Sequence, residues 1–146
     1  MDWQIKHFKE LDTMELYKII KERVDVFVVE QNCPYPECDN KDLESYHIFS
    51  IDEGNIVAYA RILPKGISYN EVSIGRVLVN QKYRKQGLGK ELMENTLRFI
   101  KDELNETNIR ISAQEYLFKF YCELGFEQVS EIYLEDGIPH LEMIYI

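Results

Sequence analysis

The first part of the chain combines a strand-like and a helix-like pattern of apolar residues. Trp3 to Phe8 alternates apolar and polar side chains, which predicts an opening strand. Asp12 or Thr13 is suited to cap a helix whose apolar positions are Leu16, Ile19, Ile20 and Val24. The next run, VDVFVVEQ, continues this helix, bends it or forms a buried strand, because a short β-branched segment fits each pattern.

The middle of the chain predicts a loop followed by three strands. CPYPECDNKD (33–42) is a loop, because its prolines remove backbone donors and its Asp-Asn pair favours turns. Tyr46 to Ile51 and Ile56 to Leu63 flank the polar connection DEGN, which predicts a β-hairpin. Glu71 to Val79 is a further strand. Its apolar positions change parity at Gly75-Arg76, which predicts a β-bulge beside the glycine.

The second half contains the clearest helix. From Gly87 onward, apolar residues recur every three or four positions, at Leu88, Leu92, Met93, Leu97 and Ile100. Ile109 to Ala113 is a predicted strand, and Tyr116 to Leu124 is a predicted helix with Gly125 as its C-cap. Two strands surround the turn EDGIP, at Gln128 to Leu134 and Leu141 to Ile146. Strands in series with single inserted helices predict an α/β or α+β sandwich, with a strand–helix–strand crossover over residues 72–113.

Length and composition favour a single domain that spans residues 1–146. A chain of 146 residues is long enough for one core and too short for two ordinary domains. No stretch reaches the roughly 18 uninterrupted apolar residues of a membrane span, so we expect a cytoplasmic protein without a membrane partner. The odd number of cysteines argues against a disulfide framework, and Cys33 and Cys38 lack the spacing of a zinc knuckle.

Net charge narrows the class of partner. A formal charge of −9 argues against nucleic-acid binding, since neutralisation of phosphates supplies most of that affinity. The same field favours cationic partners, and amines are cations at neutral pH. Solubility alone is an alternative reason for the charge.

The stretch YRKQGLGK concentrates positive charge where the clearest helix begins. Backbone N–H groups in the first turn of a helix lack intrahelical partners and lie at the positive end of the macrodipole, so they attract phosphate oxygens. Gly87 and Gly89 remove the β-carbons that would hold those oxygens away, and the surrounding cations are Lys82, Arg84, Lys85 and Lys90. The Gly-Lys-Ser/Thr of a Walker loop is missing, and Leu92 stands where a dinucleotide fingerprint needs a third glycine. A simple tight turn is the alternative.

In its context this loop resembles the acetyl-CoA segment of the GNAT N-acetyltransferase superfamily. Arg84-x-x-Gly87-x-Gly89 follows the strand VLV and opens a helix, as in the superfamily pattern Gln/Arg-x-x-Gly-x-Gly/Ala. Downstream, Ala113-Gln114 and FYCELGF (120–126) are similar to the second cofactor segment of that superfamily. Four further stretches resemble its ElaA-type subgroup, namely RVDVFVVEQNCPYPECDNKDL (23–43), VAYARIL (57–63), IGRV (74–77) and EDGIPHLEM (135–143).

The resemblance implies a GNAT-like fold with a cofactor site. The implied fold is a mixed, mostly antiparallel central β-sheet with helices on both faces, splayed between its fourth and fifth strands at about residues 72–80 and 109–114. Acetyl-CoA (CoA) is expected in that gap, with backbone groups of Leu78 and Val79 on the pantetheine and amides from Lys85 to Lys90 on the diphosphate. The implied cofactor-binding residues are Leu78, Val79, Arg84, Lys85, Gln86, Gly87, Leu88, Gly89, Lys90 and Gln114, among which Arg84 also steadies the loop.

The implied reaction is direct attack of an amine on the thioester, which needs a proton donor for the thiolate and a base for the amine. We assign Tyr121 as general acid, because a phenol of pKa ~10 can protonate a nearby thiolate and the superfamily often has a tyrosine at this position. Core packing is the alternative. Glu71 is the candidate base, with Glu30 and His47 as alternatives. A surface carboxylate at the end of a strand is the other interpretation of Glu71. Candidate substrate-binding residues are Glu30, His47 and His140, although isolated histidines are often structural, and no metal site is expected.

The expected function is transfer of an acetyl group from acetyl-CoA to the primary amine of a small molecule or peptide, through a ternary complex. Acidic residues of the proline-containing loop are candidates to receive that amine, namely Glu37, Asp39, Asp42 and Glu44. A solvated acidic loop is the alternative. A different function with the same fold is a CoA-sensing or protein-interaction module with little or no turnover. A monomer and a homodimer are both compatible with the sequence.

Overall fold

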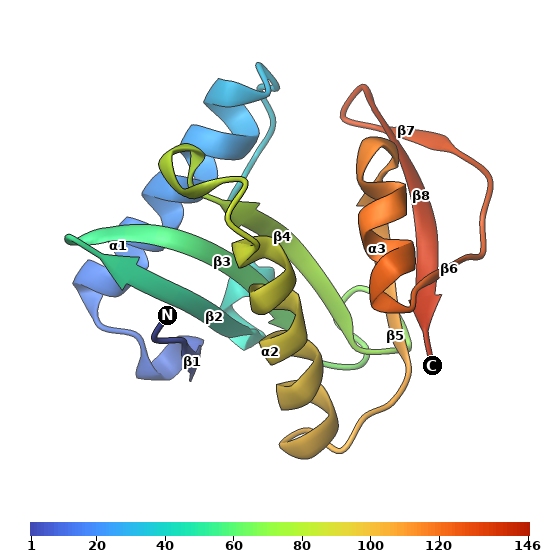
Figure 1. Cartoon of the computed structure of the whole chain (residues 1–146), viewed down its shortest axis with the longest axis horizontal. Helices are drawn as coiled ribbons and strands as arrows, with labels where there is room; N and C mark the ends of the chain where they lie inside the picture. Colours follow the sequence, from blue (N-terminus) through green and yellow to red (C-terminus); the bar gives the residue numbers. More distant parts are fainter.

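Two antiparallel sheets organise the chain, and the computed structural model describes residues 1–146 (Figure 1). The first sheet has the strand order β1-β2-β3-β4, with bounds Gln4–His7, Tyr46–Asp52, Asn55–Leu63 and Ser73–Val79. The second has the order β5-β8-β6, and β7 also pairs with β8; in chain order β5 to β8 span Ile109–Gln114, Glu127–Gln128, Tyr133–Glu135 and Ile138–Tyr145. The predicted hairpin is β2–β3.

Three α-helices accompany the sheets: α1 (Thr13–Arg23), α2 (Leu88–Asp102) and α3 (Phe118–Leu124). α1 begins at the predicted cap, where the Asp12 carboxylate accepts the N–H of Glu15 (2.7 Å) and the Glu15 carboxylate accepts the N–H of Asp12 (3.0 Å). α3 ends as predicted at Gly125, whose left-handed backbone (φ 109°) closes the helix. A helix able to cross a membrane, which must be both long and apolar, does not occur in the structure.

The first sheet is covered by helices on both faces. Ile48 of β2 packs in a core that includes residues of α2, whereas its neighbour Phe49 packs in a core that includes Ile19 of α1. β3 repeats this alternation with Ala60 and Tyr59. Successive side chains of a strand point to opposite faces, so these strands bury both faces and carry nearly continuous apolar runs. The expected arrangement of helices is confirmed.

The two sheets touch at one end of β4 and β5 and diverge from that point (Figure 1). Arg110 donates its backbone N–H to the carbonyl of Val72 (2.9 Å), and Val72 and Ile109 form an isolated parallel bridge. Beyond this bridge β4 pairs only with β3, and β5 pairs only with β8. The predicted splay between the fourth and fifth strands is confirmed. It leaves one edge of β4 without a partner strand.

Two local irregularities lie beside the splay. Arg76 has a left-handed backbone (φ 52°), and the register of β4 against β3 shifts near the same point, so the predicted bulge is present. The ambiguous run after α1 is a π-helix, Val24–Glu30, in which the N–H of Gln31 donates to the carbonyl of Val26 five residues earlier (3.2 Å). The run continues the first helix, and the buried-strand alternative is wrong.

The strand expected at 128–134 is interrupted. It consists of β6 and β7, which pair with different parts of β8 and are separated by residues 129–132. Between them the hydroxyl of Ser130 accepts the backbone N–H of Glu142 (2.8 Å), so a side chain replaces a ladder partner there. The sequence pattern does not reveal this replacement.

The β7–β8 hairpin is tighter than predicted, since β8 begins at Ile138 and not at Leu141. Its turn consists of Asp136 (φ 51°) and Gly137 (φ 78°), both left-handed, which is the backbone of a two-residue hairpin turn. Asp-Gly is a favoured sequence for this turn. The turn fixes the register in which Tyr133 lies opposite His140.

Candidate active site

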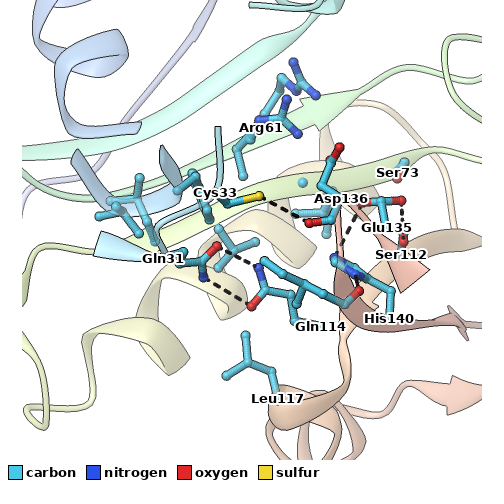
Figure 2. A pocket seen from close by; sticks show the side chains of 18 of the residues that line it. Gln31, Cys33, Arg61, Ser73, Ser112, Gln114, Leu117, Glu135, Asp136 and His140 are labelled. Carbon is cyan, nitrogen blue, oxygen red and sulfur yellow. Dashed lines mark hydrogen bonds and ion pairs between the residues drawn. The ribbon is translucent and has the colours of Figure 1, made fainter. Parts of the chain in front are cut away.

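A cavity of about 690 Å³ lies between the diverging sheets, and side chains from both halves meet across it (Figure 2). Its walls come from β4, β5, α3, the end of the π-helix and the β7–β8 hairpin. The candidate site residues that line it are Glu30, Leu78, Val79, Arg84, Gly89, Gln114, Tyr121 and His140. Lys85 to Leu88 and Lys90 flank Gly89 in the loop and in the first turn of α2.

The loop before α2 leaves several backbone donors without partners. Lys85 (φ 66°) and Gly87 (φ 78°) are left-handed, and Gly87 is the N-cap of α2 without any side-chain hydrogen bond to the helix. The first helical bond runs from the N–H of Glu91 to the Gly87 carbonyl (3.1 Å), so the N–H groups at 88–90 have no helical acceptor. Such a concave row of donors at the positive end of a 15-residue helix is suited to bind a phosphate.

The two glycines of this loop serve different purposes. Gly87 is needed for its left-handed backbone, and a β-carbon there would meet nothing within 4 Å. Gly89 has no such backbone, but its β-carbon would project toward Phe120 (3.7 Å) and Val79 (3.8 Å) in the wall of the cavity. Glycine at 89 therefore preserves space in the cavity beside the free amides. An extended diphosphate–pantetheine group fits this arrangement of donors and open space.

Arg84 is held by the protein and is not free to bind a phosphate. Its two terminal nitrogens donate to the two carboxylate oxygens of Glu30 (2.6 and 2.8 Å), and its Nε donates to the Val79 carbonyl (2.9 Å). The hydrogen bond and charge of Arg84 lower the pKa of Glu30, which makes that carboxylate a weak base. Arg84 thus fastens the loop to the end of the π-helix and to the end of β4.

The unpaired edge of β4 offers backbone groups to the cavity. Asn80 donates its N–H to the Val57 carbonyl on β3 (2.7 Å). Peptide groups of a strand alternate between its two edges, so Leu78 also turns its amide toward β3, whereas Val79 turns its amide toward the gap. The carbonyl of Val79 already accepts from Arg84, which agrees with this direction. Of the two residues expected to hold pantetheine, Val79 has the required orientation and Leu78 does not.

Tyr121 projects into the cavity from α3. It is 6% exposed, and its ring contacts those of Phe120 and Phe126 edge-on, with centroids 5.2 and 5.7 Å away. The side chain lines the cavity, its hydroxyl has no hydrogen bond to the protein, and burial raises its pKa. The phenol therefore stays protonated at neutral pH, with its hydrogen available to a group bound in the cavity.

Comparison with known proteins assigns this fold and cavity to a family. The chain matches an acetyltransferase (GNAT) domain over residues 15–146. It belongs to the GNAT acetyltransferase family. It is 41% identical to Escherichia coli ElaA over 145 residues, which are 98% of this chain and 95% of that protein. A UPF0039 protein of Schizosaccharomyces pombe is 43% identical over the same number of residues, with the same two coverages.

Solved structures of GNAT proteins agree with this assignment. An acyl-CoA N-acyltransferase from Pseudomonas aeruginosa superposes with a TM-score of 0.94 at 41% identity, covering 99% of both chains. The crystal structure of E. coli ElaA superposes with a TM-score of 0.93 at 40% identity, covering 100% of both chains. The resemblance to the ElaA-type subgroup is confirmed over the whole chain.

Within this GNAT fold the candidate base Glu71 lies in the wrong place. It does not line the cavity, because it precedes β4 at the end where the two sheets join. Its carboxylate is bound by Arg110 (3.2 Å), and this contact lowers the pKa of Glu71. A carboxylate outside the cavity, with a lowered pKa, cannot take a proton from a substrate inside it.

His47 is a structural residue of the core, fully buried and outside the cavity. Its Nε2 lies 3.1 Å from the Asp42 carbonyl, which only accepts, so Nε2 carries the hydrogen and Nδ1 accepts the hydroxyl of Tyr59 (2.6 Å). Both ring nitrogens are satisfied. Burial lowers the pKa of His47 to about 4, so it is neutral at pH 7 and binds no substrate.

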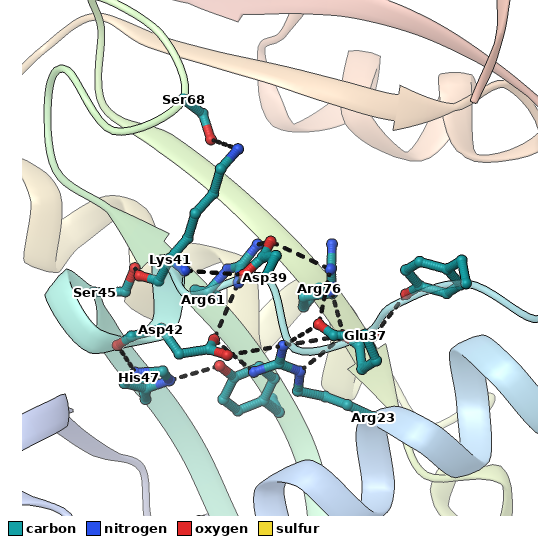
Figure 3. A network of polar contacts seen from close by, with 12 residues as sticks. Arg23, Glu37, Asp39, Lys41, Asp42, Ser45, His47, Arg61, Ser68 and Arg76 are labelled. Atoms are coloured by element: carbon teal, nitrogen blue, oxygen red, sulfur yellow. Dashed lines mark hydrogen bonds and ion pairs between the residues drawn. The ribbon is translucent and has the colours of Figure 1, made fainter. Parts of the chain in front are cut away.

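The carboxylates of the acidic loop, which were proposed to receive the amine, are paired with arginine side chains from other elements (Figure 3). Arg23, which is fully buried, donates to Glu37 (3.0 Å) and Asp42 (2.7 Å). Arg61 binds Asp39 and Asp42, and Arg76 binds Glu37 and Asp39. Three guanidinium groups therefore neutralise three carboxylates. Glu37, Asp39 and Asp42 anchor the loop to α1, β3 and β4 instead of receiving a cationic amine.

Two contacts cross the cavity between the halves of the GNAT fold (Figure 2). Gln31 and Gln114 exchange side-chain amide hydrogen bonds (3.2 and 3.3 Å), and the Cys33 thiol donates to the Asp136 carbonyl (3.4 Å). Gln114 was expected on the cofactor, and it lies in the cavity with its amide engaged by Gln31. Cys33 is the only cysteine among the lining residues.

The cavity is also lined by residues that the sequence patterns did not identify as site residues, chiefly Gln31, Ser112, Glu135 and Asp136. The position of Glu135 could have been predicted. Asp136-Gly137 is a typical two-residue hairpin turn, so the residue before the turn must pair with the strand that follows it. His140, which was proposed as a substrate residue, lies on that next strand and lines the cavity. Gln31 and Ser112 carried no signal of this kind.

The buried arginine network should make a large contribution to stability. Replacing Arg23 with methionine (Arg23→Met) leaves buried carboxylates without one of their partners, and we expect a loss of about 3–5 kcal/mol in the free energy of unfolding. Urea denaturation measures it. The matched control is Lys21→Met on the same helix, whose ion pair with Asp25 is exposed and should contribute little to stability. Equal losses in the two variants would contradict the assignment.

His47 should make stability depend on pH. Its pKa is about 4 in the folded protein, against an ordinary value of 6.5, so below pH 6.5 the unfolded chain binds a proton that the folded chain does not. Stability should therefore fall as pH decreases from about 6.5 to 4, by up to about 1.4 kcal/mol per unit. In His47→Gln this slope should flatten. Denaturation at several pH values measures the change of the unfolding free energy with pH in wild type and variant. A loss of stability that is the same at every pH does not alter this slope. Equal slopes in the two proteins would refute the role of His47.

Proposed function

We propose that this protein is an acetyl-CoA-dependent N-acetyltransferase, which transfers the acetyl group to a primary amine of a small molecule or peptide by direct attack. The observation that carries the proposal is the meeting of three features in one cavity: the free amides before α2, the unpaired edge of β4 and the Tyr121 hydroxyl. The P. aeruginosa relative, an acyl-CoA N-acyltransferase, supports the choice of donor.

The cofactor would be held mainly by backbone groups. Amides between Lys85 and Lys90 would bind the diphosphate, with the side chains of Lys85 and Lys90 adding charge, and the open edge of β4 at Val79 would bind pantetheine amides. Arg84 keeps the loop in position through Glu30. When bound, acetyl-CoA supplies a thioester carbonyl carbon for the amine to attack.

Tyr121 would act as the general acid. Its raised pKa keeps the phenol protonated at neutral pH, so its hydrogen is available to the departing thiolate. Because a thiolate is a weaker base than the phenolate, the transfer is completed when the phenolate is reprotonated. The resulting phenolate is itself a strong base, and it regains a proton from the new amide nitrogen. The side chain therefore returns to its starting state in each turnover.

The cavity favours direct attack over a covalent enzyme intermediate. Its one cysteine, Cys33, donates its thiol to a carbonyl on the opposite wall. Neither His47 nor His140 has a hydrogen bond to that sulfur. An activated nucleophile needs such a base.

Gly89→Val should weaken acetyl-CoA binding without unfolding the protein. The new side chain would occupy the space between Phe120 and Val79 beside the free amides, and the backbone of Gly89 is not left-handed, so the helix can form. We expect at least about a tenfold weaker Kd by calorimetry, equivalent to about 1.4 kcal/mol. Glu94→Val, exposed on the same helix, is the control. Wild-type protein that takes up neither CoA nor acetyl-CoA would refute the proposed function.

Tyr121→Phe should separate chemistry from binding. Removal of the acid should lower kcat by about 100-fold or more, whereas the Kd for acetyl-CoA should stay within about twofold. The fold should persist, because the hydroxyl has no hydrogen-bond partner in the protein. The matched control is Tyr17→Phe, which changes an exposed tyrosine of α1. Thiol release with a panel of primary amines measures turnover, and equal rates in wild type and Tyr121→Phe would remove the assignment.

A further inference from the structure

One histidine of the cavity has a ring nitrogen without a hydrogen-bond partner. His140 Nδ1 lies 2.7 Å from the Ile138 carbonyl oxygen. A carbonyl oxygen only accepts, so Nδ1 carries the hydrogen and the neutral ring has its lone pair at Nε2. This nitrogen accepts no hydrogen bond from the protein, although only 8% of the His140 side chain is exposed. The ring lines the cavity, so this nitrogen can accept a hydrogen bond from a donor bound there.

Glu135 faces the same nitrogen. Its Oε2 lies 3.5 Å from His140 Nε2, and in the neutral ring both of these atoms are acceptors. The other oxygen, Oε1, accepts from the Ser112 hydroxyl (3.2 Å). Ser112 has a single hydrogen, so its oxygen in turn accepts from Tyr133. This chain of hydrogen bonds holds the carboxylate with one oxygen turned toward the histidine.

The β7–β8 hairpin brings these groups together. Tyr133 pairs with His140 and Glu135 with Ile138 in the register that the Asp-Gly turn fixes. Residues two apart on a strand share a face, so all four side chains lie on one face of the hairpin. The rings of Tyr133 and His140 stack at 6.3 Å with an angle of 22°. The cavity that contains Tyr121 is also lined by Glu135, Ile138 and His140. Figure 2 shows Glu135 and His140 side by side at this wall.

We propose that Glu135 and His140 bind the acceptor as a primary ammonium ion and that His140 Nε2 takes its proton. This inference rests on the proposed function and adds the acceptor side of the same site. An ammonium group has three N–H donors, so it satisfies Nε2 and Oε2 together, and its charge is balanced by Glu135. Glu135 has no arginine or lysine partner, in contrast to the carboxylates of the buried network. Primary alkylammonium ions are the substrate class, in preference to alcohols, which lack the charge.

The protons and bonds balance in this scheme. One proton moves from the ammonium nitrogen to Nε2, and Glu135 stabilises the imidazolium that forms. The lone pair of the amine makes the N–C bond as the C–S bond breaks, and the sulfur takes a proton from Tyr121. Tyr121 regains a proton from the new amide nitrogen, and His140 releases its own to solvent. Ammonium ion and thioester thus give amide, thiol and one free proton.

An NMR titration of the protein without acetyl-CoA tests the binding step. The His140 ring nitrogens are identified by their loss in His140→Gln, and the probes are butylammonium chloride and butyltrimethylammonium chloride. We expect the primary ion to shift the Nε2 signal and the quaternary ion, which has charge but no N–H donor, to leave it unchanged. Glu135→Gln should weaken the response to butylammonium at least about fivefold, whereas the exposed control Glu131→Gln should not. Equal responses to the two ions, or none, would overturn the proposal.

Kinetics test the proton transfer. The substrate is whichever of butylamine, spermidine and a lysine-containing peptide the wild type acetylates fastest. His140→Gln should lower kcat by about 100-fold, with an unchanged Kd for acetyl-CoA by calorimetry, and Glu135→Gln should chiefly raise the KM for the amine. Normal kcat in His140→Gln would overturn this inference and leave the acetyltransferase function in place. Failure of the wild type to bind acetyl-CoA would instead refute that function, and the ammonium titration would still decide the role of the pair.

Discussion

The organisation of this protein depends on how β4 and β5 are joined. They share one bridge, between Val72 and Ile109, and separate beyond it. If the two strands stayed paired beyond this point, their hydrogen bonds would use the backbone groups along the edge of β4. No cavity would then lie between them. Because the strands diverge, one edge of β4 has no partner strand beyond Val72, and the crossover helix α2 begins near the far end of that edge. The open edge and the cavity are therefore consequences of the divergence of two strands, and the unpaired amides at the start of α2 adjoin them.

The two halves are held in different ways, and this explains where the site is stiff. Two buried arginines, Arg23 and Arg61, and the partly exposed Arg76 anchor the loop at 33–42 to α1 and to the first sheet, so this wall of the cavity is fixed by paired charges. Across the cavity the halves meet through weaker contacts, namely the Gln31–Gln114 amide pair and the Cys33–Asp136 bond. Neutral hydrogen bonds of this kind contribute about 1 kcal/mol each, so a bound group can displace them at little cost.

Features encoded by neighbouring residues could be predicted from the sequence, and those created by distant contacts could not. The loop before α2 was predictable because glycines, cations and a helix start lie within eight residues, and the bulge at Arg76 because a bulge shifts the local apolar pattern. The prediction for Glu71 was wrong because the sequence shows only that this residue adjoins β4. It does not show that Glu71 lies at the end of β4 that is bridged to β5. The acidic loop misled because its arginine partners come from α1, β3 and β4.

The two histidines considered at the outset show why composition alone does not separate structure from function. In each ring one nitrogen faces a backbone carbonyl, which places the hydrogen there and leaves the other nitrogen as an acceptor. In His47 that acceptor is satisfied by the Tyr59 hydroxyl, and the ring is complete within the core. In His140 the acceptor faces a carboxylate, a neighbour that offers no hydrogen unless one of the two groups is protonated. The difference is a missing donor, and it occurs on the wall of the cavity where an amine substrate would bring one.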